Sequence, residues 1–212
     1  MTALAQPTIP RDDRARLAHN ELVASVPIWR LSVEQYHAML NAGILKSGDP
    51  VELLEGWLVQ KMVKHPPHSI ATQLTSEGLR SVMPAGWCVN NQEPVTTETS
   101  EPEPDVTVVR GKHRDYSDHH PGPADVGLLV EVAEASLAYD QGPKKRVYAR
   151  ERFPIYWIIN LVENQIEVYT DPSGPAEQPD YRQRQVFRPG DEIPVVLDGH
   201  EVGRLPVRDL LP

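Results

Sequence analysis

The spacing of apolar residues predicts two helices and a pair of strands in the first part of the chain. Ser32 and Gln35 form a capping-box pattern ahead of an apolar helical face, which predicts a helix over about 32–41. The stretch 51–59 predicts two short strands that turn at Glu55-Gly56. Apolar residues that share one helical face predict a second helix over about 68–83.

Three predicted strands follow, and two of them are of the buried type. Residues 87–97 have mixed polarity and a break at Pro94, residues 105–109 are β-branched and mostly apolar, and residues 128–133 are apolar except for Glu131. Both buried-type strands therefore carry one acid each.

The last third of the chain predicts one helix and then further strands. A helix is expected from Pro143 to Arg152, a buried strand over 155–159 and its hairpin partner over 165–169. The proline-rich remainder predicts short strands and turns that close the sheet. From residue 68 the order is αβββαβ, which predicts an α/β fold with a central mixed β-sheet flanked by helices.

The proline content and the composition of the first 30 residues indicate how the chain is organised. The 212 residues include 21 prolines, about twice average usage, which excludes a long-helix bundle or a coiled coil. Residues 1–30 mix prolines and charges with no sustained period, so we expect a flexible N-terminal arm before a domain over 31–212.

Cysteine content and apolar runs indicate the compartment. One cysteine excludes an intrachain disulfide framework, no apolar run approaches the length of a membrane span, and the N-terminus does not read as a signal peptide. We therefore expect a cytoplasmic protein with no membrane partner. The net charge of −9 argues against general nucleic-acid binding, unless the carboxylates gather at a metal site.

Two acids in buried-type strands are the candidate chemistry. A buried carboxylate is costly unless it meets a cation or a hydrogen-bond donor, and Glu131 lies in such a strand. Asp105 heads its own strand after Pro104, at the end of a run of four acids without a base. Carboxylates on neighbouring strands suit a hard divalent ion such as Mg²⁺. The segment 143–152, with five bases and one acid, offers positive charge for phosphate beside that pocket.

Each acid also has an ordinary structural explanation when it is taken alone. Asp105 fits a turn residue after a proline, and Glu131 fits a core carboxylate paired with an arginine.

A series of motifs follows in fixed order along about 31–211: Glu52-Leu-Leu-Glu55-Gly56, His68 opening a helix, Glu103-Pro104-Asp105-Val106, Leu129-Val130-Glu131-Val132, Ser136-Leu-Ala-Tyr-Asp140, Lys144, Tyr148-Ala-Arg150 and Pro154-Ile-Tyr-Trp-Ile158. In this order they resemble the Uma-two family, which is placed in the PD-(D/E)xK nuclease superfamily. This resemblance implies a restriction-endonuclease-like core.

The resemblance implies a metal-dependent endonuclease acting on DNA. By that resemblance Asp105 and Glu131 hold Mg²⁺, or Mn²⁺, and Lys144 is the catalytic lysine. The superfamily usually places this lysine two residues after the acid, where this chain has Ala133. A flexible lysine stem can bring the ammonium to the same water from the following helix.

Four further residues are secondary candidates, and three of them also have a structural explanation. His68 either leans into the cleft or is a polar helix start, and Asp140 either contacts Lys144 or caps the helix. Glu52 and Glu55 are shared with the family, although turn chemistry also explains Glu55.

A second hypothesis is a catalytically weak or inactive nuclease-fold protein that acts as a binding or regulatory module. Because nucleases that cut duplexes often act as dimers, a homodimer is a further expectation.

Overall fold

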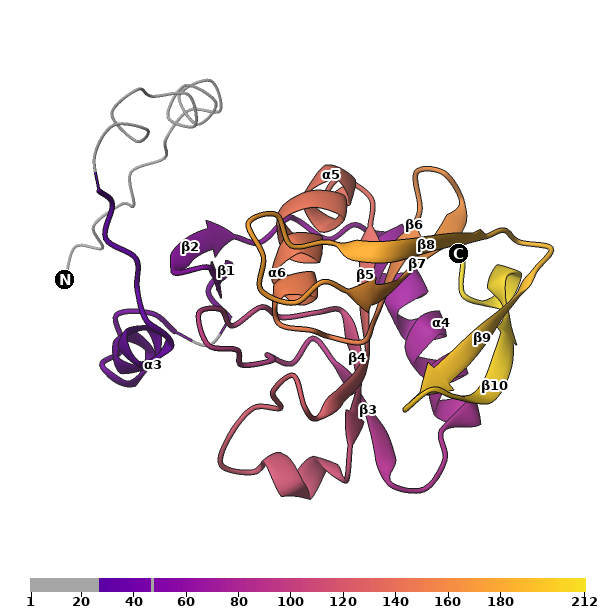
Figure 1. The fold of residues 1–212 in the computed structure, drawn as a ribbon, viewed down its shortest axis with the longest axis horizontal. Coiled ribbons are helices and arrows are strands. Elements are labelled where there is room, and N and C mark those ends of the chain that lie inside the picture. The colour runs from indigo at the N-terminus through magenta and orange to yellow at the C-terminus, as the bar shows by residue number, and fades with distance from the viewer. Residues whose placement is uncertain (1–26, 47) are drawn as a thin grey trace. The chain divides into compact units, whose positions relative to one another are not determined.

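A six-stranded mixed sheet forms the centre of the domain in the computed structural model, which describes residues 27–46 and 48–212 (Figure 1). Its strands are β3 (Trp87–Asn91), β4 (Val106–Arg110), β5 (Val126–Ala133), β6 (Ile155–Asn160), β7 (Gln165–Pro172) and β8 (Tyr181–Phe187). They lie side by side in sequence order, and only β5 and β6 are parallel neighbours. A parallel pair needs a crossover connection, and the chain makes it through helices.

Helices and two small hairpins surround this sheet. The helices are α3 (Val33–Asn41), α4 (Pro66–Val82), α5 (Leu137–Tyr139) and α6 (Lys145–Arg150), with a π-helical turn over Asp140–Lys144. Short 3₁₀ turns lie at His113–Tyr116 and Val207–Asp209. The hairpins are β1 (Val51–Leu54) with β2 (Trp57–Gln60), and β9 (Glu192–Leu197) with β10 (His200–Pro206). In the part of the chain described, no helix is both long and apolar enough to cross a bilayer.

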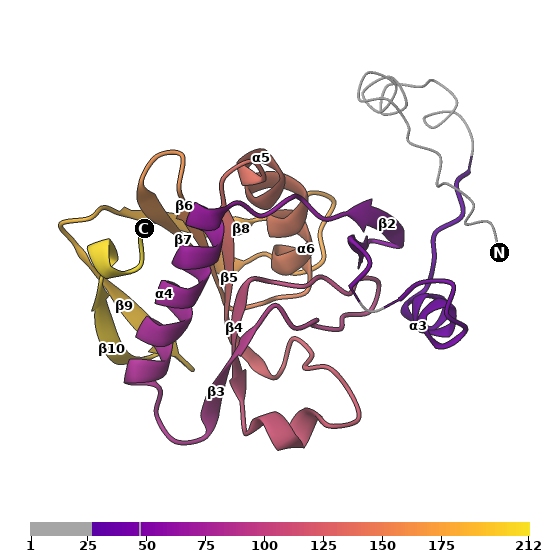
Figure 2. The same cartoon turned by 180° about the vertical axis from the view of Figure 1, so that it is seen from behind.

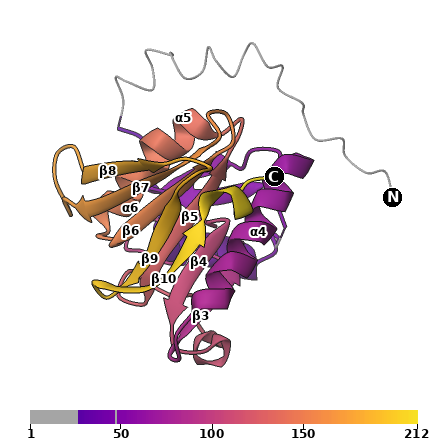
Figure 3. The same cartoon turned by 90° about the vertical axis from the view of Figure 1, so that its right-hand side faces the viewer.

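The sheet is covered on both faces. Helix α4 and the β9–β10 hairpin lie on one side, and α5 and α6 lie on the other (Figures 2 and 3). Strand β5 shows why both faces need cover, because all eight of its residues are buried. Successive side chains point to opposite faces. Accordingly Leu128 and Val130 join the core under α4, whereas Leu129 packs with Tyr148 of α6 and Tyr156 of β6.

Several sequence predictions are confirmed by these elements. The order αβββαβ from α4 to β6 and the central mixed sheet are present. Ser32 caps α3 by a true capping box, since its Oγ accepts a hydrogen bond from the Gln35 amide and its own amide donates to Gln35 Oε1. Helix α4 begins at Pro66, two residues before the predicted start, because proline fits the first turn of a helix.

Three local predictions are wrong for identifiable reasons. The strand predicted to Thr97 ends at Asn91, because Gln92 adopts a left-handed φ of 55° and a loop follows. The helix predicted to begin at Pro143 starts at Leu137, with Pro143 inside the π-helical turn. Proline has no amide hydrogen to donate to the preceding turn, which favours a widened turn over regular α-helix. The C-terminal strands do not all extend the sheet, since β9 and β10 form their own hairpin. The predicted N-terminal arm lies outside the described residues, except for residues 27–30.

Candidate active site

Strand pairing brings the two candidate acids to the same end of adjacent strands. Val106 of β4 pairs with Val130 of the antiparallel strand β5, so Asp105, just before Val106, and Glu131, just after Val130, both lie one position beyond that pair. Both are buried, with exposed fractions of 5% and 3%. Burying a carboxylate without compensation is costly, so the donors around each acid determine its state.

Asp105 is surrounded by donors on both of its oxygens. Its Oδ2 accepts a hydrogen bond from the Val132 amide at 2.9 Å and lies 3.1 Å from His68 Nε2. Its Oδ1 lies 3.3 Å from Lys64 Nζ and accepts a hydrogen bond from the side-chain Nε2 of Gln92 at 3.4 Å. Burial alone would raise the pKa of Asp105, but the hydrogen bond and charge of His68, with the charge of Lys64, lower it to about 2. Asp105 is therefore ionised at neutral pH.

Glu131 accepts hydrogen bonds from a buried lysine and a buried tyrosine. Its Oε1 accepts hydrogen bonds from Lys144 Nζ at 2.8 Å and from the Tyr148 hydroxyl at 2.6 Å. Among the described residues, none donates a hydrogen bond to its Oε2. Burial raises the pKa of Glu131 to about 8, although the charge of Lys144 opposes the rise. A further positive charge near Oε2 would therefore stabilise the ionised form of Glu131.

Lys144 joins Glu131 to two other acids. Its Nζ lies 3.5 Å from Glu52 Oε2, which also accepts a hydrogen bond from the Glu103 amide. Burial would lower the pKa of Lys144, but the charges of Glu131, Glu52 and Asp140 raise it well above its usual value. Burial also raises the pKa of Asp140 to about 6 against the opposing charge of Lys144. The lysine is thus a charged ammonium held among carboxyl groups.

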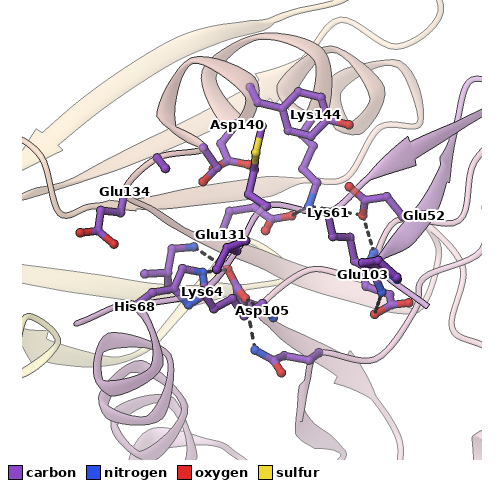
Figure 4. A pocket seen from close by; sticks show the side chains of 18 of the residues that line it. Glu52, Lys61, Lys64, His68, Glu103, Asp105, Glu131, Glu134, Asp140 and Lys144 are labelled. Atoms are coloured by element: carbon purple, nitrogen blue, oxygen red, sulfur yellow. Dashed lines mark hydrogen bonds and ion pairs between the residues drawn. The ribbon is translucent and has the colours of Figure 1, made fainter. Parts of the chain in front are cut away.

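These groups line one open pocket of about 540 Å³ (Figure 4). Of the seven residues predicted from the sequence, six line its wall: Glu52, His68, Asp105, Glu131, Asp140 and Lys144. They come from β1, α4, the end of the loop before β4, β5 and the π-helical turn. Residues far apart in sequence therefore meet at one end of the sheet.

Glu55 lies outside this pocket and pairs with two arginines. It occupies the β1–β2 turn with a φ of 48°, and its carboxylate lies 2.6 Å from Arg146 Nη2 and 2.6 Å from Arg150 Nη1. Lys145 similarly pairs with Asp180. The bases of the 143–152 segment that we expected to face phosphate are thus largely engaged in ion pairs within the protein.

The structure adds pocket residues that the sequence analysis did not assign. Lys61 and Lys64 line the pocket, and Tyr148 reaches Glu131 from α6. The lysines had a detectable signal, because the segment 61–68 carries two lysines and two histidines without an acid. Tyr148 belongs to a motif that the chain shares with the family, but the sequence assigned it no role, and Gln92 had no signal, since only the fold brings it to Asp105.

Comparison with known proteins finds a solved structure with a similar fold and a family model that matches the chain. The structure is similar to the crystal structure of a putative nuclease belonging to DUF820 from Anabaena variabilis, with a TM-score of 0.58 and 16% sequence identity. The match covers 85% of this chain and 97% of that one, and at this identity it speaks to the fold alone. No curated protein matches the chain. The family model Uma2, described as a putative restriction endonuclease, matches residues 33–207, and the chain therefore belongs to the Uma2 family.

Proposed function

We propose that this protein is a metal-dependent endonuclease that hydrolyses DNA phosphodiester bonds at the pocket formed by Asp105, Glu131 and Lys144. Membership of a nuclease-like family supports a hydrolase. The observation that carries the proposal is the meeting of two buried acids, from adjacent strands, with one buried lysine in the wall of an open pocket. Such an arrangement is expensive for stability alone, since buried charges cost several kcal/mol each.

The donor set of the pocket fits Mg²⁺ or Mn²⁺. Within the described part of the chain, no group of three or more His, Cys, Asp or Glu side chains forms a ready-made metal cage. Mg²⁺ does not need one, because it is usually held by one or two carboxylates and keeps several waters. Asp105, with its lowered pKa, and the Oε2 of Glu131 would supply those two oxygen ligands. When bound, the ion would lower the pKa of a water and polarise a phosphoryl oxygen.

The side chains around these acids have separate roles in the proposal. Lys144 is fixed by Glu131 and Glu52, so its ammonium is positioned to stabilise negative charge on a phosphoryl oxygen or to orient the attacking water. His68 and the Val132 amide hold Asp105 ionised and in one orientation. Tyr148 donates a hydrogen bond to Oε1 of Glu131, so that Oε2 is the oxygen available to a metal ion.

The test is cleavage of supercoiled plasmid and single-stranded DNA by the purified full-length protein with Mg²⁺, with Mn²⁺ and with a chelator. We expect metal-dependent nicking that falls by at least about a hundredfold in Asp105→Asn and Glu131→Gln, since each removes a proposed ligand. Glu177→Gln is the matched control, because Glu177 is exposed and lies outside the pocket. An RNA substrate of the same sequence distinguishes DNA from RNA.

Two outcomes would count against the proposal. Equal nicking by the wild type and both pocket variants would identify a contaminating nuclease. Metal-independent DNA binding without cleavage would support the alternative of a nuclease-fold binding module.

The homodimer expected from the sequence stays a prediction, which light scattering on the same samples measures.

A further inference from the structure

The segment Lys61–His68, which we call the cationic strap, connects β2 to α4 along the rim of the pocket. It contains Lys61, Lys64, His65 and His68 and no acid. Each of these side chains contacts a carboxylate that lines the pocket, as Figure 4 shows for those that it labels. The strap therefore places two lysines and two histidines against the acidic wall.

The contacts of the strap differ in strength along its length. His68 is buried at the start of α4 and holds Asp105 from a fixed position. Lys64 has an exposed fraction of 39% in its side chain, and its Nζ stands 3.3 Å from Asp105 Oδ1. Next to it, Val63 is 79% exposed. A partly exposed pair beside a segment with few packed apolar contacts can separate at low cost.

Lys64 and a divalent ion would compete for one carboxylate. The proposed function, on which this inference rests, assigns Asp105 as a metal ligand. Lys64 already forms an ion pair with that carboxylate. A doubly charged ion at Asp105 would displace a singly charged ammonium by repulsion. The displaced ammonium would remain tethered at the pocket rim without a counterion, where a DNA phosphate is the natural replacement.

We propose that Lys64 is a DNA-phosphate-binding residue that is held on Asp105 until a divalent ion takes its place. Lys61 binds phosphate from the same strap, but its Nζ pairs at 2.7 Å with Glu103, which is not a proposed metal ligand. The two lysines therefore differ in one respect: only Lys64 couples metal binding to DNA binding.

This arrangement gives Lys64→Gln effects of opposite sign on two ligands. Removing the competitor tightens metal binding, and removing the phosphate contact weakens DNA binding. A purely structural role for Lys64 would weaken both, because loss of the pocket geometry harms both ligands. Lys61→Gln weakens DNA binding alone.

The experiment measures each ligand by itself on the full-length protein. Mn²⁺ affinity is measured by titration calorimetry without DNA, and we expect Lys64→Gln to bind about threefold tighter, the effect of losing one partly exposed ion pair. Affinity for a labelled 20-base-pair duplex is measured by fluorescence anisotropy with Ca²⁺, with gel electrophoresis to verify that the duplex stays intact. Lys64→Gln and Lys61→Gln should each reduce the slope of log K against log salt by about 1.

Matched variants separate charge from shape. Lys64→Arg keeps the charge and should retain wild-type salt dependence. Lys46→Gln removes an exposed lysine outside the pocket and should leave both affinities unchanged.

The proposal is overturned if Lys64→Gln leaves Mn²⁺ affinity unchanged or weakens it, or if its salt slope equals that of the wild type. Carboxylate-dependent cleavage by the wild type together with either result overturns the role of Lys64 and leaves the proposed function standing. A wild type that binds no Mn²⁺ overturns both.

Discussion

Replacing Lys144 by methionine tests the buried charge cluster through stability, independently of any catalytic assay. The Nζ of Lys144 lies 2.8 Å from Glu131 and 3.5 Å from Glu52, and the side chains of both acids are at most 4% exposed. Removing one partner of a buried pair leaves an uncompensated charge, which typically costs about 3–5 kcal/mol. For a chain of 212 residues this corresponds to a loss of about 6–20 °C in melting temperature.

The loss should depend on pH in a defined direction. Burial raises the pKa of Glu131 to about 8 while Lys144 opposes the rise, so removing the lysine raises that pKa further. A group whose pKa is raised on folding stabilises the protein most below its unfolded pKa, ordinarily near 4.5, and loses that contribution as pH increases. We therefore expect a small penalty for Lys144→Met near pH 5, where Glu131 is protonated with or without the lysine, and a penalty that grows as the pH rises above about 8, toward pH 10.

The assay is urea unfolding followed by circular dichroism at pH 5 and pH 10, with a double-mutant cycle. Glu131→Gln in the Lys144→Met background removes the orphaned charge and should recover at least about 2 kcal/mol near pH 10, where that carboxyl is ionised. Lys145→Met is the control, because its partner Asp180 is exposed and such pairs contribute about 1 kcal/mol or less. A penalty for Lys144→Met that is equal at pH 5 and pH 10, or a double variant with additive losses, would refute the reasoning.

Three further predictions concern the surrounding framework. A methyl group on Gly127 would stand 2.7–2.9 Å from an aromatic ring and a leucine methyl, so Gly127→Ala should cost about 1–3 kcal/mol in chemical unfolding, whereas Gly190→Ala, with nothing within 4 Å, should not. Burial would raise the pKa of Glu167, but its hydrogen bonds and the charge of Arg184 lower it. Ionised Glu167 therefore stabilises the fold above about pH 4.5, and this stabilisation is lost as the pH falls. Glu167→Gln should reduce the free energy of unfolding at pH 7 and make that free energy depend less on pH in the acid range. Tyr148→Phe removes a buried donor to Glu131 and should cost about 1–3 kcal/mol in the same assay, and an unchanged midpoint would contradict the 2.6 Å hydrogen bond.

Local sequence patterns predicted much of the fold, because the geometry of a helix cap or a buried strand depends on residues that are close together in the sequence. The capping box at Ser32 and the apolar run around Glu131 each depend on neighbouring residues, and both elements are present near their predicted bounds. The π-helical turn around Pro143 was missed, because periodicity read from sequence assumes a regular helix. Its consequence is large, since this turn carries Lys144 to the acids.

The candidate site was only partly predictable from the sequence. A charge inside a buried-type strand identifies Glu131 as unusual without any structure, and a basic run marks the strap that contains Lys64. Pairing partners are not visible in this way. Glu55 meets Arg146 and Arg150 across more than 90 residues of sequence, so the ion pairs that engage these two arginines could not be predicted from the sequence.

The most direct measurement of the central claim is the anomalous signal of Mn²⁺ in crystals of the full-length protein. The account predicts a peak within coordination distance, about 2.0–2.3 Å, of an oxygen of Asp105 and of Glu131, with Lys64 displaced from Asp105. No peak at these two carboxylates, or a peak elsewhere on the chain alone, would contradict it.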